Sequence, residues 1–446
     1  MKRIFNKVKF AYLYIVGSIG FFPTVMSLLF LALAILMIYL ETQGISESLK
    51  ENLPFLIITN GETAQTVLSS ITTGIISLMV FSFTMVMLML NQAGSNFSPR
   101  VIPGLITHKS NQKIMGLYLG TLVYTLVVMV NIRSDSYYES LPGLAVFLAM
   151  AFTILSLSFF LYFIHSISQS IQIGNILESI HNVTRSNLEK LVKSDKKLAE
   201  PSVFKDADWQ DLVSPRSGYV QSIHGEAVAE LCQKQQVILD FLQPQGSFIV
   251  KGTPFARINR PLEDKKKFSD ELLDNVNFNN SELADVNYLH GFKQITESAV
   301  KALSPGINDP GTAVKAIDYL TDLFAIRMQL TDSNLLEDKE GVVRVRFSQE
   351  TFDYLYLLCF GSIRQYGKGD TLVVLRMLYA FKNLLHLTKD HPNRLGALVE
   401  EAKMLLYDAA EQISNPGDRK KINKDLQEIN QNKMLRNPLP LLDIVD

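Results

Sequence analysis

Four long stretches of the sequence are predominantly apolar and contain no Asp, Glu, Lys or Arg. They are residues 18–40, 64–90, 114–130 and 144–165. The hydrocarbon core of a membrane is about 30 Å thick, and a helix needs about 20 mostly apolar residues to cross it. The absence of charge separates these stretches from amphipathic surface helices. The sequence therefore predicts a membrane α-helical fold, with four transmembrane helices within residues 1–165.

The composition of the whole chain agrees with this prediction and argues against several classes of function. The chain has 446 residues, 47% of them hydrophobic, and a formal net charge of -1. Because it has no strong positive charge to attract nucleic acid, we expect no nucleic-acid partner. Its two cysteines, Cys232 and Cys359, lie far apart, and neither has a Cys or His at metal-ligand spacing. We therefore predict no metal, no disulfide framework and no cofactor.

The charges between the apolar stretches predict the orientation of the chain in the membrane. Four basic residues precede the first stretch, namely Lys2, Arg3, Lys7 and Lys9. The segment after that stretch carries four Glu residues against one Lys, whereas residues 91–113 carry three basic residues and no acid. Short loops rich in Lys and Arg stay on the cytoplasmic side. We therefore expect a multi-pass protein of the cytoplasmic (inner) membrane with both termini in the cytoplasm.

The C-terminal half is predicted to be a cytoplasmic α+β region. Residues 166–200 have apolar residues near helical spacing, which indicates a helical connector. Alternating patterns in "SGYVQSIHG" and "GSFIVKGTPFARI" predict a small β module over residues 201–264. Its order of elements resembles the barrel-sandwich fold of biotinyl and lipoyl carrier domains. The lysine motif that is modified in those domains is missing, so we expect a structural module.

The remaining residues are predicted to form a helical domain followed by a tail. Residues 265–415 have apolar residues at helical spacing, interrupted by "VVRVRF". This short run alternates, with Val343, Val345 and Phe347 on one face and Arg344 and Arg346 on the other, and predicts a strand. The tail, residues 416–446, is charged and rich in amides. We expect it to dock on a neighbour or to be disordered.

The stretch "KALSPGINDPGTAVKA", residues 301–316, forms an unusually rigid corner between two predicted helices. Asp309 as N-cap, Pro310 at the first helical position and Thr312 two residues later favour the start of a helix, which makes the corner a structural joint. A helix start among small polar residues also presents backbone N–H groups to an anion. The possible anion-binding residues are Ser304, Gly306, Asn308, Asp309, Gly311 and Thr312. Because nothing in the spacing of Ser304, His290 and Asp309 requires catalysis, no enzyme is predicted.

The second apolar stretch carries a row of polar residues along one helical face. The row consists of Thr66, Ser70, Thr73, Ser77, Thr84 and Asn91. Such a row indicates either close packing between helices, with each hydroxyl bonded to the carbonyl four residues earlier, or a pore lined when identical helices assemble around an axis. The predicted spans contain no acid or base of the kind that ion-coupled transporters place in the membrane. This absence favours a passive channel or a structural anchor.

Several segments together carry a family resemblance. The chain contains "FSFTMVMLMLNQAGSNFSPRVI", "LYLGTLVYTLVVM", "ALSPGINDPGTA" and "SIRQYG". In these it resembles an uncharacterised bacterial family of predicted membrane proteins, the domain of unknown function 2254, with its ALSPGINDP hallmark. The resemblance implies a four-span inner-membrane protein with a cytoplasmic C-terminal domain, and it implies no catalytic residue.

Two functions therefore remain open from the sequence. The first is a passive channel or transporter-like pore, gated by the cytoplasmic domain and formed by a homo-oligomer in the lipid bilayer. The second is a membrane-anchored scaffold or sensor whose cytoplasmic domain binds a protein partner or a small anion.

Overall fold

A computed structural model of the chain describes residues 20–43, 58, 60–96, 109–132, 143–170, 173–195, 208–279 and 288–444. The chain divides into two compact units, Met1–Asn175 and Ile176–Asp446. The basic residues Lys2 to Lys9 and Arg100, on which the predicted orientation partly rests, lie outside the described residues.

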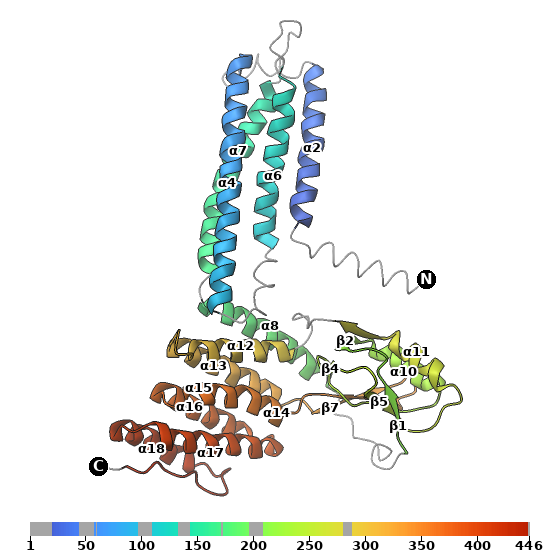
Figure 1. Cartoon of the computed structure of the whole chain (residues 1–446), viewed down its shortest axis with the longest axis vertical. Helices are drawn as coiled ribbons and strands as arrows, with labels where there is room; N and C mark the ends of the chain where they lie inside the picture. Colours follow the sequence, from blue (N-terminus) through green and yellow to red (C-terminus); the bar gives the residue numbers. More distant parts are fainter. Residues whose placement is uncertain are drawn as a thin grey trace. The chain divides into compact units, whose positions relative to one another are not determined.

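The N-terminal unit contains four long helices that lie side by side (Figure 1). They are α2 (Phe21–Thr42), α4 (Gly61–Asn96), α6 (Lys109–Val130) and α7 (Gly143–Ser170). Each is long and apolar enough to cross a membrane, which confirms that the four predicted stretches form long apolar helices. Helix α6 contacts the other three helices. It is also the most buried of the four helices.

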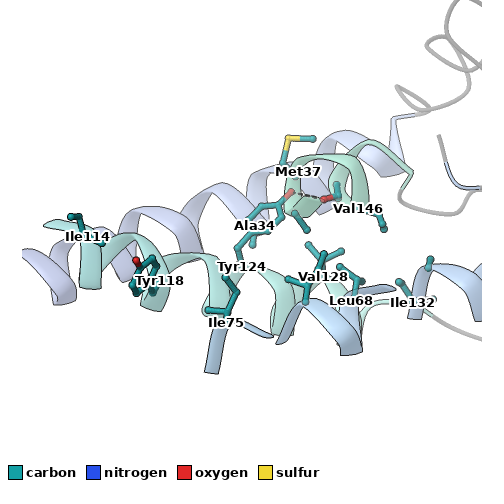
Figure 2. Close-up of a cluster of buried hydrophobic side chains, with 14 of the residues drawn as sticks. Ala34, Met37, Leu68, Ile75, Ile114, Tyr118, Tyr124, Val128, Ile132 and Val146 are labelled. Atoms are coloured by element: carbon teal, nitrogen blue, oxygen red, sulfur yellow. Dashed lines mark hydrogen bonds between the residues drawn. The ribbon is translucent and has the colours of Figure 1, made fainter. Parts of the chain in front are cut away.

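Small residues of α6 allow α2 to approach closely. A Cβ atom on Gly116 would lie 2.7 Å from the sulfur of Met26, and one on Gly120 would lie 2.8 Å from the ring of Phe30. Larger residues at these positions would push the helices apart. Further along, Ala34, Leu68 and Tyr124 belong to a buried cluster to which all four helices contribute (Figure 2).

One helix boundary differs from the prediction in a way that matters. Helix α2 continues to Thr42, two residues beyond the predicted end at position 40, and so includes Glu41. Glu41 is buried, and its carboxylate accepts a hydrogen bond from the backbone N–H of Ala145 at the start of α7. Assigning Glu41 to a loop was therefore wrong, because a tertiary contact holds this acid in the last turn of the helix.

The C-terminal unit begins with the connector helix and a region of small mixed sheets. Helix α8 spans Ile173–Ser194, within the predicted connector. The strands are β1 (Gln210–Val213), β2 (Gly218–Ile223), β3 (Leu239–Phe241), β4 (Phe248–Ile249), β5 (Pro254–Ile258), β6 (Val276–Asn279), β7 (Ser333–Glu337) and β8 (Val343–Ser348). Helices α10 (Gly225–Lys234) and α11 (Lys265–Leu273) lie between them in the sequence.

The strands form two sheets rather than a closed barrel among the described residues. One has the order β1-β5-β3-β8-β7 and the other the order β4-β2-β6. The predicted strand at "VVRVRF" is present as β8, and it pairs in parallel with β3. The larger sheet thus combines strands from the predicted β module with strands from the predicted helical domain. The finer likeness to a barrel-sandwich fold is not confirmed.

A buried carboxylate joins the three central strands of the larger sheet. Asp240 on β3 lies between Arg346 on β8 and Arg257 on β5 in the strand register. Arg346 donates two hydrogen bonds of 2.7 Å to Asp240, and Arg257 donates one of 2.8 Å. Since bidentate Arg–carboxylate pairs have a fixed geometry, this cluster helps to set the register of β8.

Helices that pack in layers make up the rest of the C-terminal unit (Figure 1). They are α12 (Tyr288–Ala302), α13 (Pro310–Arg327), α14 (Phe352–Tyr356), α15 (Ser362–Gly367), α16 (Thr371–Leu387), α17 (Leu395–Gln412) and α18 (Pro416–Asn430). A π-helical turn, Leu357–Gly361, joins α14 to α15, and a 3₁₀ turn, Pro392–Arg394, precedes α17.

The C-terminal tail docks on its own chain, contrary to the expectation of disorder or of docking on a neighbour. Helix α18 packs on α16, and residues beyond it remain bound to α18. The side chain of Asn423 bonds both the N–H and the carbonyl of Leu442, and that of Asn430 does the same for Leu439. These paired amide bonds hold two apolar side chains in place, and both are buried.

Candidate functional site

The polar row on the second span lies on the face of α4 that is exposed in the single chain. Five of its hydroxyls, those of Thr66, Ser70, Thr73, Ser77 and Thr84, donate to the carbonyl four residues earlier at 2.8 to 3.0 Å. Asn91 continues the row and is also exposed. We call these six residues the α4 stripe.

The opposite face of α4 packs inside the bundle. Ala64, Leu68 and Ile75 on that face are almost completely buried. The α4 stripe therefore points away from the core of its own chain. Whether it lines a pore or packs against another helix stays a prediction, because the single chain contains neither.

The corner at residues 301–316 has the geometry of a capped helix start. Asp309 is the N-cap of α13, and its Oδ1 accepts the backbone N–H of Thr312 at 3.1 Å. The hydroxyl of Thr312 donates to the other carboxylate oxygen of Asp309 at 2.6 Å. Pro310 occupies the first turn of the helix, as predicted. These contacts satisfy donors that a bare helix start would leave open.

Several backbone N–H groups of the corner form hydrogen bonds within the corner itself. The N–H groups of Ile307 and Asn308 donate to the carbonyl of Ser304, and that of Asp309 donates to Ala302. Asn308 has a φ of 49°, in the left-handed region that Asn tolerates better than most residues. Gly306 and Gly311 are exposed on the same turn. Because these donors already have internal partners, the geometry is that of a joint, and the anion site stays a prediction.

A groove beside this corner brings together two segments that are far apart in the sequence. Its volume is about 720 Å³. It is lined by Thr296, Glu297, Val300, Lys301 and Ser304 on one side and by Leu357, Gly361, Ser362, Arg364, Gln365 and Tyr366 on the other. Ser304 belongs to "ALSPGINDP", and the second side includes most of "SIRQYG". Of the possible anion-binding residues, only Ser304 lines this groove.

Arg364 anchors the wall of the groove to α17. Its guanidinium donates to Glu401 at 2.7 Å and also bonds Asp408. Burial raises the pKa of Glu401, although Arg364 opposes that shift. The charge of Arg364 is thus already matched by two acids, which leaves the guanidinium a structural role in the wall.

A second, more polar cavity lies between the smaller sheet and α12. Its volume is about 370 Å³. The lining residues are Tyr219, Gln243, Gln245, Gly246, Ser247, Phe248, Leu289, His290, Lys293 and Glu350. Burial raises the pKa of Glu350, and Lys293 opposes that shift. The cavity therefore places a lysine, a histidine and several amides around a small volume.

The part of the chain that the structure describes contains no metal-binding cluster and no reactive cysteine. No group of three or more His, Cys, Asp or Glu residues could hold a metal ion there. Cys232 and Cys359 are both buried and free, and burial raises the pKa of each thiol to about 12. At neutral pH both thiols are therefore protonated and unreactive.

Sequence reasoning missed Glu41 as a candidate functional residue. One carboxylate oxygen accepts the N–H of Ala145 at 3.1 Å, and the other is buried without a hydrogen-bond partner among the described residues. The signal was present, because Glu41 directly follows the predicted end of the first span. Because α2 extends to Thr42, the first candidate span includes Glu41. The prediction that the spans contain no acid therefore does not hold for this helix.

Four apolar helices long enough to cross a membrane, followed by an α+β unit, define the class as a predicted membrane protein with a large C-terminal α+β unit. The chain belongs to the family described as Predicted membrane protein (DUF2254), whose model matches residues 17–383. This confirms the family that the sequence resembled.

The chain is also similar to individual curated proteins. It is 23% identical over 350 residues to an uncharacterised protein of Mycobacterium tuberculosis and to one of Mycobacterium bovis, and the match covers 76% of this chain. The aligned region covers 66% of the length of these relatives. No solved structure matches the chain.

Proposed function

We propose that the protein is a homo-oligomeric channel of the inner membrane, in which the α4 stripe of each copy faces a shared axis. The observation that carries this proposal is the position of the stripe on the face of α4 that the chain's own bundle leaves exposed. The C-terminal unit is then the gate. We propose no enzymatic activity.

The chemistry of the stripe suits a water-facing surface. Each hydroxyl donates its proton to its own helix, so its oxygen lone pairs remain available to water or to a passing solute. Gly74 lies among these residues, and nothing lies within 4 Å of the position that its Cβ would occupy. Packing within one chain does not require a glycine there, and a residue without a side chain would allow a second copy to approach closely.

Cysteine accessibility tests the proposal. Single cysteines at Thr73 and Ser77 should react with a small charged thiol reagent, and labelling should block solute flux from reconstituted vesicles, because thiolate chemistry requires water at that depth. A single cysteine at Phe83 is the matched control. Phe83 is also exposed on α4, but it lies about 100° away from Thr84 around the helix. Flux that persists after Thr73 and Ser77 are fully labelled, or stripe cysteines that stay inert in the assembled protein, would exclude a stripe-lined pore.

A second candidate is a membrane-anchored scaffold or sensor whose C-terminal unit binds a partner or a small anion. The cavity of about 370 Å³ lined by Lys293 and His290 supports this alternative. Calorimetric titration of the full-length protein with inorganic phosphate tests it. Lys293→Gln should abolish the binding, and Lys339→Gln, which changes an exposed lysine outside the cavity, should leave it unchanged. Phosphate binding without any solute flux would favour the sensor over the channel.

A further inference from the structure

The interior of the N-terminal bundle contains polar oxygens that the stripe-lined pore does not use. Six of them are buried without a hydrogen-bond partner among the described residues, on Glu41, Thr72, Ser82, Asn111, Gln112 and Tyr118. Ser82 and Tyr118 are 0% exposed, and Glu41, Asn111 and Gln112 are at most 7% exposed. Unpaired buried oxygens are costly, and lipid offers them no water. So many in one bundle call for a physical reason.

At one end of the bundle, a carboxylate and a phenol meet at the first turn of α7. Oε1 of Glu41 accepts the N–H of Ala145, and the hydroxyl of Tyr124 donates to the carbonyl of the same residue at 3.1 Å. This second bond is the dashed line beside Tyr124 in Figure 2. Oε2 of Glu41 is buried and has no hydrogen-bond partner in the part of the chain that the structure describes. The acid is thus held through one oxygen only.

The middle of the bundle contains hydroxyls from three helices. The hydroxyls of Thr121 on α6 and Ser156 on α7 lie 3.4 Å apart, and both residues are 0% exposed. Tyr118 lies one turn before Thr121 on α6, and its hydroxyl faces Ser82 on α4. Neither oxygen has a hydrogen bond of good geometry. Each of these groups can both donate and accept a hydrogen bond.

At the other end, the amide oxygens of Asn111 and Gln112 are buried near the start of α6. Asn111, Tyr118 and Thr125 are seven residues apart and so lie on one face of the helix. The distance from Asn111 to Thr125 is about 21 Å at 1.5 Å per residue. Together with Tyr124 and Glu41, the polar row extends over most of a hydrocarbon core about 30 Å thick.

We propose that this row is a proton-conducting path inside the bundle of a single chain, with Glu41 at one end and Asn111 and Gln112 at the other. A chain of groups that both donate and accept hydrogen bonds, ending on an intramembrane acid, is the chemistry of proton relays. Ordered water between unpaired oxygens completes such a chain, because buried water binds where polar groups lack partners. Ile75 and Phe163 belong to the same buried apolar cluster as Tyr118 and Tyr124, and such surroundings favour a proton over a hydrated metal ion.

The transfer balances without a co-reactant. Oε2 of Glu41 takes up one proton from water at its end of the bundle and releases it to the next oxygen. Each hydroxyl or water in the row accepts a proton from one neighbour as it gives one to the other. Water beside Asn111 and Gln112 releases the last proton. No bond other than O–H forms or breaks, and the net result is one proton moved along the bundle.

Proton flux in vesicles tests this path. The full-length protein is reconstituted with a pH-sensitive dye inside, and a potassium diffusion potential drives proton entry. The wild-type protein should acidify the vesicles faster than protein-free lipid does. Glu41→Gln should slow this rate at least 10-fold. Glu62→Gln, which changes an exposed acid on the first turn of α4, should leave the rate unchanged.

Tyr118→Phe separates conduction from a packing role. Because the Tyr118 hydroxyl has no hydrogen bond of good geometry among the described residues, its removal should leave the melting temperature unchanged or raise it, while the proton rate falls at least 10-fold. A lower melting temperature with an unchanged proton rate would show that the hydroxyl serves only packing. Wild-type vesicles no more permeable to protons than protein-free lipid would overturn the proposal.

This path is independent of the pore proposed above, and the two fail separately. Reagent attached to a cysteine at Thr73 should block solute flux through a stripe-lined pore and leave the proton rate unchanged. If labelling at Thr73 abolishes the proton current as well, the protons pass along the stripe and not through the bundle.

Discussion

Gly291 on α12 lies directly against Thr184 on α8. A Cβ atom on Gly291 would lie 1.7 Å from the hydroxyl oxygen of Thr184, which no side chain could tolerate without movement. Near this crossing, His181 on α8 bonds Asp322 on α13 at 2.7 Å and stacks on Tyr319. The connector helix is thus fixed to the helical layers of the C-terminal unit by a close approach at Gly291 and by the contacts of His181 with Asp322 and Tyr319.

We predict that Gly291→Ala destabilises the C-terminal unit by about 1 to 3 kcal/mol, because overpacking forces the two helices apart. Gly396→Ala is the control, since nothing lies within 4 Å of its Cβ position on α17. That change should be neutral or stabilise by up to about 1 kcal/mol. Urea unfolding of the detergent-solubilised proteins measures both effects. Equal midpoints for the two variants would refute the importance of the crossing.

Asp332 neutralises two buried arginines, and its removal should be costly. Arg327, which is 0% exposed, donates to Asp332 at 2.7 Å, and Arg394 bonds the other carboxylate oxygen. We expect Asp332→Asn to cost about 3 to 5 kcal/mol, because it leaves buried charge uncompensated. Asp318→Asn is the control. It breaks the more exposed pair with Arg376 and should cost at most about 1 kcal/mol.

The same carboxylate predicts a dependence of stability on pH. Burial alone would raise the pKa of Asp332, but Arg394 and Arg327 outweigh it, and the pKa falls below the ordinary value of 3.8. A carboxylate with a lowered pKa adds stability above its unfolded pKa, and that stability is lost as the pH falls through the folded value. Between pH 5 and pH 3, about the range of the unfolded pKa, the wild-type protein should therefore lose more unfolding free energy than Asp332→Asn. Parallel pH profiles would contradict this.

The cap of α13 predicts a graded response at position 309. Asp309→Ala should cost about 1 kcal/mol, and Asp309→Asn or Asp309→Ser should recover most of it, because each accepts the N–H of Thr312. Thermal unfolding checks the order of the variants. If Asp309→Asn keeps full stability but abolishes function in cells, the corner needs its charge, and the anion site becomes the better interpretation.

The orientation in the membrane can be tested with reporters. Fusion of a reporter after Asp446 should show a cytoplasmic C-terminus, and a reporter inserted near Ser46 should lie on the opposite side, because basic segments stay in the cytoplasm. A reporter at the C-terminus that is active outside the cytoplasm would exclude both the orientation and the even number of spans.

The four spans and the helix cap were predictable because both depend on local sequence. About 20 uncharged apolar residues have few structures open to them other than a membrane helix. Asp309, Pro310 and Thr312 make their contacts within one helical turn. The strand at Val343–Ser348 was likewise predictable, because successive side chains of a strand point to opposite faces and the sequence alternates accordingly.

What lay beyond the sequence depends on contacts between distant residues. The pairing of β8 with β3 joins Val345 to Leu239, and nothing in either strand alone specifies that partner. The docking of the tail on Asn423 and Asn430 likewise depends on a surface that exists only after α18 has formed. The burial of Glu41 requires the N–H of Ala145, about a hundred positions further along the chain. Local physics selects helices and strands from neighbouring residues, but only the packed bundle decides which polar atoms lose contact with water.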